Sequence, residues 1–263
     1  MTRYMCSARI DERGRIAGGK SGDQSGEEVM VQPYYDFRRD GYTCVALRYE
    51  GDDKYAVRNR SIKANVRGAN ADLVGYDQGQ RSTFYAAMRK LGWKLANIAK
   101  TGTCETDCSQ YQGTCSNIAR LPILSKAQAI PADVYTGNMR SYFERVGYKV
   151  VSGINWSTGA GLRAGDVLVR HQASRGLGHT AMYIGTKPSG SLYVDTYKVI
   201  KTRYLYANPK KQLTKRKKKS KKGATLKYLH KKSGNWRYVE YGGVKGWVYN
   251  GGKTKAIKVK SYA

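Results

Sequence analysis

The sequence predicts an α+β fold, in which a group of helices precedes an antiparallel arrangement of strands and a small all-β module follows. Three observations predict it. Apolar residues recur at helical spacing in the segments 55–69, 83–91, 109–121 and 134–146. Strand-like composition, interrupted by Gly, Pro and Ser, follows in 148–151, 166–169, 180–184 and 191–197. After a basic run at 213–222, alternating stretches at 225–230, 236–241 and 246–249 are separated by turns that contain glycine.

The first hundred residues supply the opening elements of this fold. Residues 1–32 are rich in Gly and charge, and we expect a polar loop there. Alternating apolar residues in 27–49 predict short strands or extended segments. The helix of 55–69 is expected to end at Gly68, and Ser82 is expected to cap the helix of 83–91, which Gly92 stops. A short helix or strand follows at 93–99.

Length and composition limit the classes of protein that fit. A chain of 263 residues with 40% hydrophobic residues can bury a core in one large or two modest domains. No run approaches the roughly 20 apolar residues of a membrane span, and the N-terminus lacks the apolar centre of a signal peptide. We therefore expect a protein that is made in the cytoplasm without a secretion signal and does not span a membrane.

The charge is strongly positive and unevenly distributed. The net charge is +29, and residues 201–263 contain 20 Lys and Arg but one acid, Glu240, which leaves about +10 for the first 200 residues. Such a surface attracts a polyanion or an anionic surface. Nucleic acid, acidic lipid and a wall that carries teichoic acid all fit this charge.

Cys108 is the candidate nucleophile. Thr106 and Asp107 before it are both good N-cap residues, and the helix that follows runs toward Pro122. The sulfur then lies in the first helical turn, where unpaired N–H groups and the helix dipole favour a thiolate, so we expect a lowered pKa. The chain has five cysteines. Cys104 is expected either to be a disulfide partner or to be packed, and Cys115 is expected to face the core.

His179 is the candidate base. It opens an apolar strand directly after Gly178, where a turn can bring the ring over a cleft. His171, near the end of the preceding strand, is the alternative, whereas His230 lies in the basic module and is expected at the surface.

Two other kinds of site were weighed against this pair. Zinc held by Cys104 and Cys108 would need a second pair of ligands at suitable spacing, and none is found, so no metal is expected. Residues 14–21 match the letters of a phosphate loop, but no buried strand is expected before them and no long helix after them.

The residues around Cys108 and His179 carry a family resemblance. The Asp107-Cys108-Ser109 triplet resembles the D-C-S helix start of NlpC/P60-type cysteine peptidases and related phage amidases. Residues 178–185 resemble their G-H-x-x-x-Y-I-G strand, and the segments 7–24, 75–78 and 104–109 resemble a subset of phage endolysins. The resemblance covers most of residues 7–200. It implies a papain-like NlpC/P60 catalytic domain over residues 1–200, with helices packed on an antiparallel sheet and no cofactor.

The resemblance also implies further site residues. A third polar group that orients the histidine would come from the next strand, where Asp195 is our choice and Asp166 the alternative. The Cys108 N–H is expected to be one oxyanion donor. Tyr76 is expected either to contact substrate or to be packed. The remaining residues expected near substrate are Asp77, Gln78, Ser109 and Gly178.

The C-terminal segment resembles a second module. The order G-N-W-x-Y-V-x-Y-x-G-x-x-G-W-V, which begins at Gly234, resembles a bacterial SH3-like wall-binding module. It implies a small SH3-like barrel over residues 203–263 that binds the cell wall. The expected wall-binding residues are Tyr228, Trp236 and Tyr241, whereas Trp247 is expected in the core.

Together these resemblances imply an endolysin that hydrolyses peptidoglycan through a Cys108 thioester. The bond is either the N-acetylmuramoyl-L-alanine amide or an amide in the stem peptide. The expected partners are peptidoglycan of Gram-positive bacteria and anionic wall polymers, reached after release from the host cytoplasm, with no specific nucleic acid. The alternatives are a basic nucleic-acid-binding protein, an acyltransferase that forms a thioester, and a tail-associated lysin on the same fold.

Overall fold

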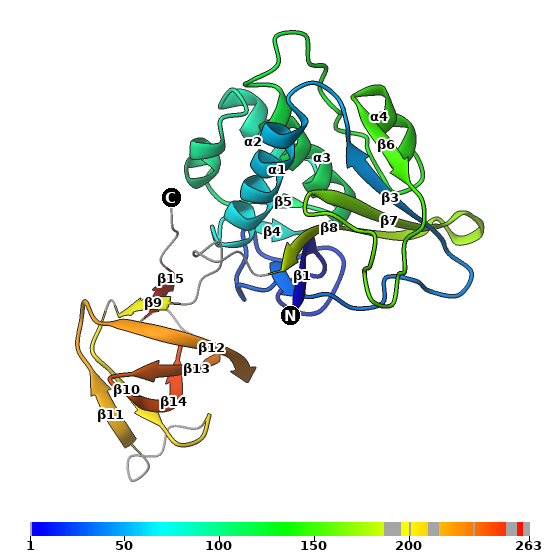
Figure 1. Cartoon of the computed structure of the whole chain (residues 1–263). Helices are drawn as coiled ribbons and strands as arrows, with labels where there is room; N and C mark the ends of the chain where they lie inside the picture. Colours follow the sequence, from blue (N-terminus) through cyan, green and yellow to red (C-terminus); the bar gives the residue numbers. More distant parts are fainter. Residues whose placement is uncertain are drawn as a thin grey trace. The chain divides into compact units, whose positions relative to one another are not determined.

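The computed structural model describes residues 2–186, 196–199, 201–209, 216–233, 235–250 and 257–259, with only the backbone of 196–198, 227–232 and 257–259. The chain divides into two compact units, Met1–Ser189 and Gly190–Ala263. Each unit has its own antiparallel sheet, and the helices among the described residues belong to the first unit (Figure 1). The predicted α+β class is confirmed, and the division of function between residues 1–200 and 203–263 stays a prediction.

The first unit is organised around a six-stranded antiparallel sheet with the order β2-β1-β8-β7-β3-β6. Strands β8 and β7 at its centre form a hairpin in which Arg170 pairs with His179. Strand β1, which lies in the segment expected to be a polar loop, pairs with both β2 and β8. The strands are β1 (Arg3–Ala8), β2 (Val29–Pro33), β3 (Thr43–Tyr49), β6 (Tyr148–Val151), β7 (Asp166–Gln172) and β8 (Leu177–Thr186).

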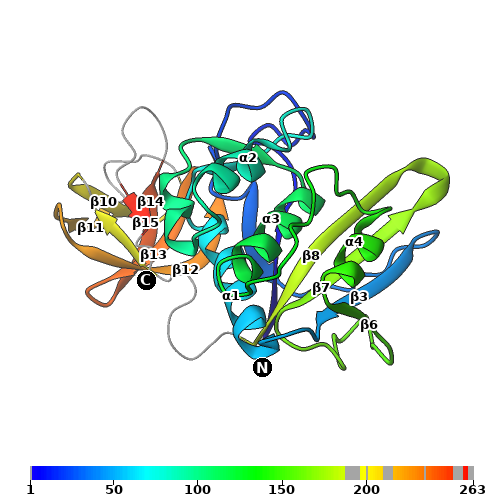
Figure 2. The same ribbon diagram turned by 90° about the horizontal axis from the view of Figure 1, so that it is seen from above.

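Two helices, α1 (Lys54–Ala69) and α3 (Cys108–Arg120), lie side by side against one face of this sheet (Figure 2). Every residue of α3 is buried, so α3 is the central helix of the unit. Hydrogen bonds join the sheet to the two helices. The Cys6 thiol of β1 and the Tyr111 hydroxyl of α3 both donate to the carbonyl of Asn65 in α1. The Gln112 amide donates to the Cys6 carbonyl at 3.3 Å.

The opposite face of the sheet is covered by loops with aromatic side chains. Because side chains alternate along a strand, Ala181 and Tyr183 point to this face, and Met182 points to the helices. The loop after β2 contributes Phe37, which is fully buried there. The buried members of this cluster are Met5, Phe37, Ala46, Leu168, Ala181 and Tyr183.

A small parallel sheet leads into the central helix. Strand β4 (Val74–Tyr76) pairs with β5 (Cys104–Thr106), so Tyr76 lies opposite Thr106, two residues before Cys108. In the sequence, the segment that connects these two strands contains α2 (Thr83–Lys90) and the short 3-10 helix η1 (Leu95–Lys100). The Ser82 side chain makes no capping hydrogen bond to α2, contrary to expectation.

The last helix is shorter than predicted. The sequence pattern predicts a helix over 134–146, but α4 spans only Met139–Arg145. Asn138 precedes it, and its side chain accepts a hydrogen bond from the backbone N–H of Tyr135, which holds the preceding residues in a turn. A one-turn 3-10 helix, η2 (Ala173–Arg175), joins β7 to β8.

The second unit is a seven-stranded antiparallel sheet with the order β11-β10-β14-β13-β12-β9-β15. Its buried core contains Val199, Leu205, Leu226, Val239 and Val248. Among the described residues this sheet does not close into a barrel, so the predicted barrel is not found. The strands are β9 (Thr196–Val199), β10 (Arg203–Tyr206), β11 (Arg216–Ser220), β12 (Thr225–Ser233), β13 (Trp236–Tyr241), β14 (Val244–Tyr249) and β15 (Ile257–Val259).

No helix within the described ranges has the length and apolar character needed to cross a membrane.

Candidate active site

Cys108 begins the central helix, as predicted, and Asp107 is its N-cap. Asp107 has an extended backbone, and its Oδ1 accepts hydrogen bonds from the N–H of Gln110 at 2.7 Å and from the hydroxyl of Ser109 at 3.0 Å. These bonds satisfy groups that the first turn would otherwise leave unpaired. The local capping chemistry therefore fixes the Cys108 side chain at the start of α3.

Arg81, which the sequence analysis did not single out, holds this cap in place. Its Nε lies 2.9 Å from Asp107 Oδ2, its Nη2 donates to Ser109 Oγ at 3.3 Å, and it also donates to the carbonyl of Val134. Burial raises the pKa of Asp107, and the Arg81 charge acts against that rise. Arg81 thus opposes the effect of burial on the carboxyl group beside Cys108.

The Cys108 thiol lies against strand β8. Only 7% of Cys108 is exposed, and the backbone N–H of Thr180 donates a hydrogen bond to its sulfur. The last residues that pair between β1 and β8 are Cys6 and Met182, so Thr180 has no partner in β1. The fold therefore brings Cys108 to the residue that follows His179.

The resting pair is uncharged, contrary to the expectation of a lowered cysteine pKa. Burial, followed by the charge of Asp107, raises the pKa of Cys108 to about 12, although the Thr180 N–H and Arg81 act in the opposite direction. Burial lowers the pKa of His179 to about 3, and the charges of Arg170 and Arg9 add to this effect. Near neutral pH the site therefore holds a thiol and a neutral imidazole.

The His179 ring lies on the sheet face that Phe37 covers. The two ring centroids are 6.0 Å apart, and Arg170 pairs with His179 across the hairpin. No direct hydrogen bond joins the Cys108 thiol to the His179 ring in the structure. The two residues are linked through the backbone of Thr180.

Two tyrosines lie near the thiol. The charge of the Cys108 thiolate contributes to raising the pKa of both Tyr76 and Tyr35, after burial, which is the largest cause for each. Tyr76 is buried, and its hydroxyl accepts a hydrogen bond from Gln78 Nε2 at 3.0 Å. Tyr35, which the sequence analysis did not select, is half-buried on the side of Arg9 and Arg170.

Asp77 and Gly178, two further residues expected near substrate, have structural contacts around the site. Asp77 accepts hydrogen bonds from the N–H groups of Gly18, Gly79 and Gln80, so it anchors loops. Gly178 lies so close to Thr136 that a Cβ atom would clash with that side chain. A larger residue at position 178 would therefore displace the strand that carries His179.

The alternatives to His179 and Asp195 have different partners. His171 Nδ1 lies 3.1 Å from Thr136 Oγ1, and its ring meets Tyr135 edge-on. Asp166 forms a two-bonded ion pair with Arg48, at 2.7 and 2.8 Å. Asp195 lies outside the described residues, so its role stays a prediction.

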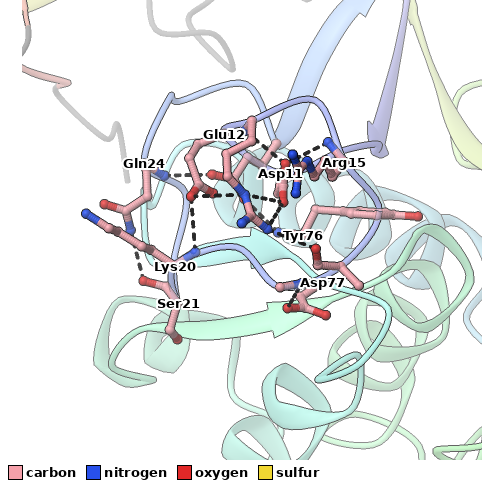
Figure 3. A network of polar contacts seen from close by, with 12 residues as sticks. Asp11, Glu12, Arg15, Lys20, Ser21, Gln24, Tyr76 and Asp77 are labelled. Carbon is pink, nitrogen blue, oxygen red and sulfur yellow. Dashed lines mark hydrogen bonds and ion pairs between the residues drawn. The ribbon is translucent and has the colours of Figure 1, made fainter.

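The loop of residues 9–28 is held by carboxylates (Figure 3). Asp11 accepts from the N–H groups of Arg13 and Arg15, and Glu12 accepts from that of Lys20. The loop contains the Gly-Lys-Ser triplet, but it opens no helix, as expected for a polar loop rather than a phosphate loop.

Buried acids connect this loop to Tyr76 and to β5. Glu28 accepts hydrogen bonds from the N–H groups of Gln24 and Tyr76, both at 2.9 Å. Glu105 Oε1 accepts from the N–H of Gly22 at 2.5 Å, and its Oε2 has no hydrogen-bond partner. Burial raises the pKa of Glu28 and of Glu105 to about 7 and that of Asp23 to about 6. No group of three or more His, Cys, Asp or Glu side chains in the described part of the chain could hold a metal ion.

The aromatic residues of the second unit are mostly packed against one another. Trp236 meets Tyr206 at 5.6 Å and Tyr249 at 5.2 Å between ring centroids, and Trp247 is buried, as expected. Tyr241 is half-buried against the core, with the Lys218 amine 5.5 Å from its ring. The side chain of Tyr228 lies outside the described residues.

Comparison with protein families identifies the first unit. A family model described as an endolysin-like domain matches residues 5–187. Comparison with curated proteins and with solved structures found no match. The family name points to lysis of the bacterial cell wall and to peptidoglycan as the substrate. Because the match covers well over half of the chain, the protein belongs to the endolysin-like domain family.

Proposed function

We propose that this protein hydrolyses an amide bond of peptidoglycan, with Cys108 as the nucleophile and His179 as the general base. The observation that carries the proposal is the position of the Cys108 thiol, at a capped helix start and hydrogen-bonded to the N–H of the residue after His179. Membership of the endolysin-like domain family supports the substrate. The first unit would be a papain-like NlpC/P60 domain.

The reaction begins from the neutral pair. As substrate enters, the His179 ring and the Cys108 thiol must come within hydrogen-bond distance, and the imidazole then takes the thiol proton while sulfur attacks the amide carbon. The Cys108 N–H donates to the developing oxyanion. The C–N bond breaks as the imidazolium returns its proton to the leaving amine, and a thioester remains. Water, deprotonated by His179, attacks the thioester, which releases the acid and restores the thiol.

Asp195 remains the proposed orienting group for His179. A carboxylate that accepts from one ring nitrogen would hold the tautomer in which the other nitrogen can accept a proton. The scissile bond is either the N-acetylmuramoyl-L-alanine amide or an amide of the stem peptide.

Hydrolysis of a glycosidic bond, another way to cut peptidoglycan, is disfavoured because the candidate acids are buried. Such enzymes use a pair of carboxyl groups, one of them with a raised pKa. Glu28 and Glu105 have raised pKa values, but they are only 1% and 2% exposed, and both accept backbone N–H groups. Their carboxyl groups bind backbone N–H groups of the loop of residues 9–28 and of β4 instead of facing a substrate.

The second unit is proposed to hold the enzyme on the wall as an SH3-like module, with Tyr228, Trp236 and Tyr241 among its contacts. Its basic strands would be attracted to the anionic polymers of a Gram-positive wall. If the protein instead served to bind nucleic acid, DNA affinity would fall steeply with salt, and no activity would depend on Cys108.

Replacing Cys108 by Ser tests the proposal, and Cys115→Ser is the matched control. Cys115 is buried in the same helix, seven residues further on. We expect Cys108→Ser to abolish clearing of purified walls while wall binding remains, and Cys115→Ser to retain clearing. Mass spectrometry of the released fragments would identify the bond and distinguish hydrolysis from acyl transfer. Clearing by a folded Cys108→Ser variant would reject the proposal.

A further inference from the structure

The turn before α4 contacts both elements of the proposed active site. The carbonyl of Val134 accepts a hydrogen bond from Arg81, which also holds the N-cap of α3. The side chain of Thr136 occupies the space where a Cβ atom of Gly178 on β8 would lie. Tyr135, between these two contacts in the chain, is therefore held next to the start of α3 and to the β7–β8 hairpin.

The ring of Tyr135 is fixed although it is exposed. A Cβ atom at Gly137 would lie 2.5 Å from Cε2 of the ring, so the ring packs on the backbone of that glycine. The Tyr135 N–H donates to Asn138 Oδ1 at 2.8 Å, and the Tyr135 carbonyl accepts from the N–H of Met139 at 2.9 Å. The residue is nonetheless 47% exposed. An aromatic ring that is ordered before a ligand arrives loses little conformational freedom on binding.

The imidazole of His171 extends this surface. The centroids of the His171 and Tyr135 rings are 6.2 Å apart, and the ring planes meet at 75°. His171 pairs with Gly178 across the hairpin, and Gly178 alternates with Thr180 and Met182 on the side of β8 that points to the helices. The pair of Tyr135 and His171 therefore lies on the side of the sheet that carries α3.

The chemistry of this pair fits a sugar. His171 Nδ1 lies 3.1 Å from Thr136 Oγ1, which orients the imidazole, and no hydrogen-bond partner of its Nε2 or of the Tyr135 hydroxyl is found among the described residues. An open aromatic ring can pack on the C–H face of a pyranose while neighbouring polar atoms bond to its hydroxyl groups. Neither side chain carries a permanent charge, so the pair is less suited to the carboxylates and amines of a stem peptide.

We propose that Tyr135 and His171 form a saccharide-binding subsite that holds a sugar of the glycan strand beside the proposed active site. This inference rests on the proposed function and specifies its substrate as a stem peptide that is still attached to its sugar. Each stem peptide in peptidoglycan is joined to a muramic acid residue, so a sugar lies next to its first amide bonds. A sugar bound at the turn before α4 would position the stem that leads from it, which lowers the entropic cost of reaching the reactive geometry.

Binding of two ligands to the Cys108→Ala protein tests the proposal. One is a disaccharide tetrapeptide of N-acetylglucosamine and N-acetylmuramic acid, and the other is the same tetrapeptide without the sugars. We expect calorimetry to show tighter binding of the disaccharide form. Adding Tyr135→Ala should weaken binding of that form by roughly two- to tenfold and bring the two affinities closer, whereas Tyr135→Phe should keep the preference because the ring remains. His171→Ala, and Gly137→Ala, whose new Cβ would displace the Tyr135 ring, should also reduce the preference.

The control is Tyr55→Ala, which removes a tyrosine that is 76% exposed on α1 and should leave the preference intact. Thermal unfolding would confirm that each variant folds. Equal affinity for the two ligands before Tyr135 is replaced, or a folded Tyr135→Ala variant that keeps the full preference for the sugar, would overturn the proposal. An equal loss of affinity for both ligands would also overturn it, because the ring would then contact the stem peptide.

Turnover separates this inference from the proposed function. In the protein that retains Cys108, Tyr135→Ala should reduce kcat/KM for the disaccharide tetrapeptide by a similar factor. Failure of the proposed function would appear as wall clearing that survives the replacement of Cys108. Failure of the subsite would leave clearing dependent on Cys108 and independent of Tyr135.

Discussion

The backbone N–H of Thr180 donates a hydrogen bond to the thiol of Cys108. This contact joins the start of the central helix to strand β8, directly after His179. The two proposed catalytic residues are therefore placed by rigid elements rather than by loops. The same contact also buries the sulfur, and burial determines its resting protonation state.

Alkylation of Cys108 should be slow in the free enzyme. A pKa of about 12, in place of an ordinary 8.5, lowers the thiolate fraction at neutral pH by roughly a thousandfold. We expect iodoacetamide to modify Cys108 at least about tenfold more slowly in the folded protein than in urea at pH 7.5, with a rate that rises up to high pH. Peptide mapping would separate it from Cys44, which is partly exposed. A rapid rate that is constant down to pH 5 would show instead a preformed thiolate.

Replacing Arg81 by Gln should destabilise the first unit, because buried Asp107 would lose its counter-charge. We expect a loss of about 1 to 3 kcal/mol in the free energy of unfolding at pH 8, measured with urea. Without Arg81 the pKa of Asp107 would rise further above that of the unfolded chain, so stability would fall with rising pH, and the loss should be smaller at pH 5. Arg140→Gln, in an exposed pair, should cost under about 0.5 kcal/mol. Equal losses for both variants would contradict the role of Arg81.

Glu105 should make the folded state less stable as pH rises toward 8. Its pKa is about 7 in the folded protein against an ordinary 4.5, so the folded chain retains a proton that the unfolded chain has lost. Stability from this group therefore falls as pH rises from about 4.5 to about 7. Glu105→Gln keeps an acceptor for the Gly22 N–H and removes the charge, so it should raise stability at pH 8 by on the order of 1 to 3 kcal/mol and flatten the pH dependence of Tm. The exposed control Glu144→Gln should leave the wild-type pH dependence unchanged, and an unaltered slope in Glu105→Gln would refute the assignment.

The exposed lysines of β11 should contribute to wall binding through charge. We expect the pair of changes Lys217→Gln and Lys219→Gln to weaken binding to purified walls at 50 mM salt by roughly two- to fivefold per lysine, equivalent to about 0.5 to 1 kcal/mol each. The difference should shrink at 500 mM salt, where screening is stronger. The matched pair Lys126→Gln and Lys149→Gln removes two exposed lysines of the first unit and should have little effect. A salt-independent loss would indicate that these lysines act through structure rather than charge.

The features that sequence could predict are those with local causes. The start of α3 at Cys108 follows from the Asp107 cap, whose hydrogen bonds reach only two and three residues along the chain. The hairpin of β7 and β8, with His179 near its turn, follows from alternation and from the glycines between the strands. Sequence therefore placed Cys108 at its helix start and His179 on its strand, and their catalytic pairing stays a prediction.

The features that sequence could not predict depend on burial and on pairing between segments far apart in the chain. Strand β1 has polar and charged neighbours, and its partner β8 lies about 180 residues away, so no local pattern indicates it. Arg81 reaches Asp107 from the end of a loop before α2. The parallel pairing of β4 with β5, and hydrogen bonds between Thr83 and Glu105, bring these segments together. The lowered pKa expected for Cys108 was wrong, because burial of the sulfur raises the pKa more than the helix dipole lowers it.

Trapping the acyl-enzyme tests the central claim most directly. Wild-type protein turning over a purified muropeptide would be quenched in acid and digested, and the peptide that contains Cys108 examined by mass spectrometry. The account predicts a fraction of this peptide heavier by the acyl half of the substrate, and no adduct or product with Cys108→Ala. Continued hydrolysis by Cys108→Ala, or an adduct on a different residue, would contradict it.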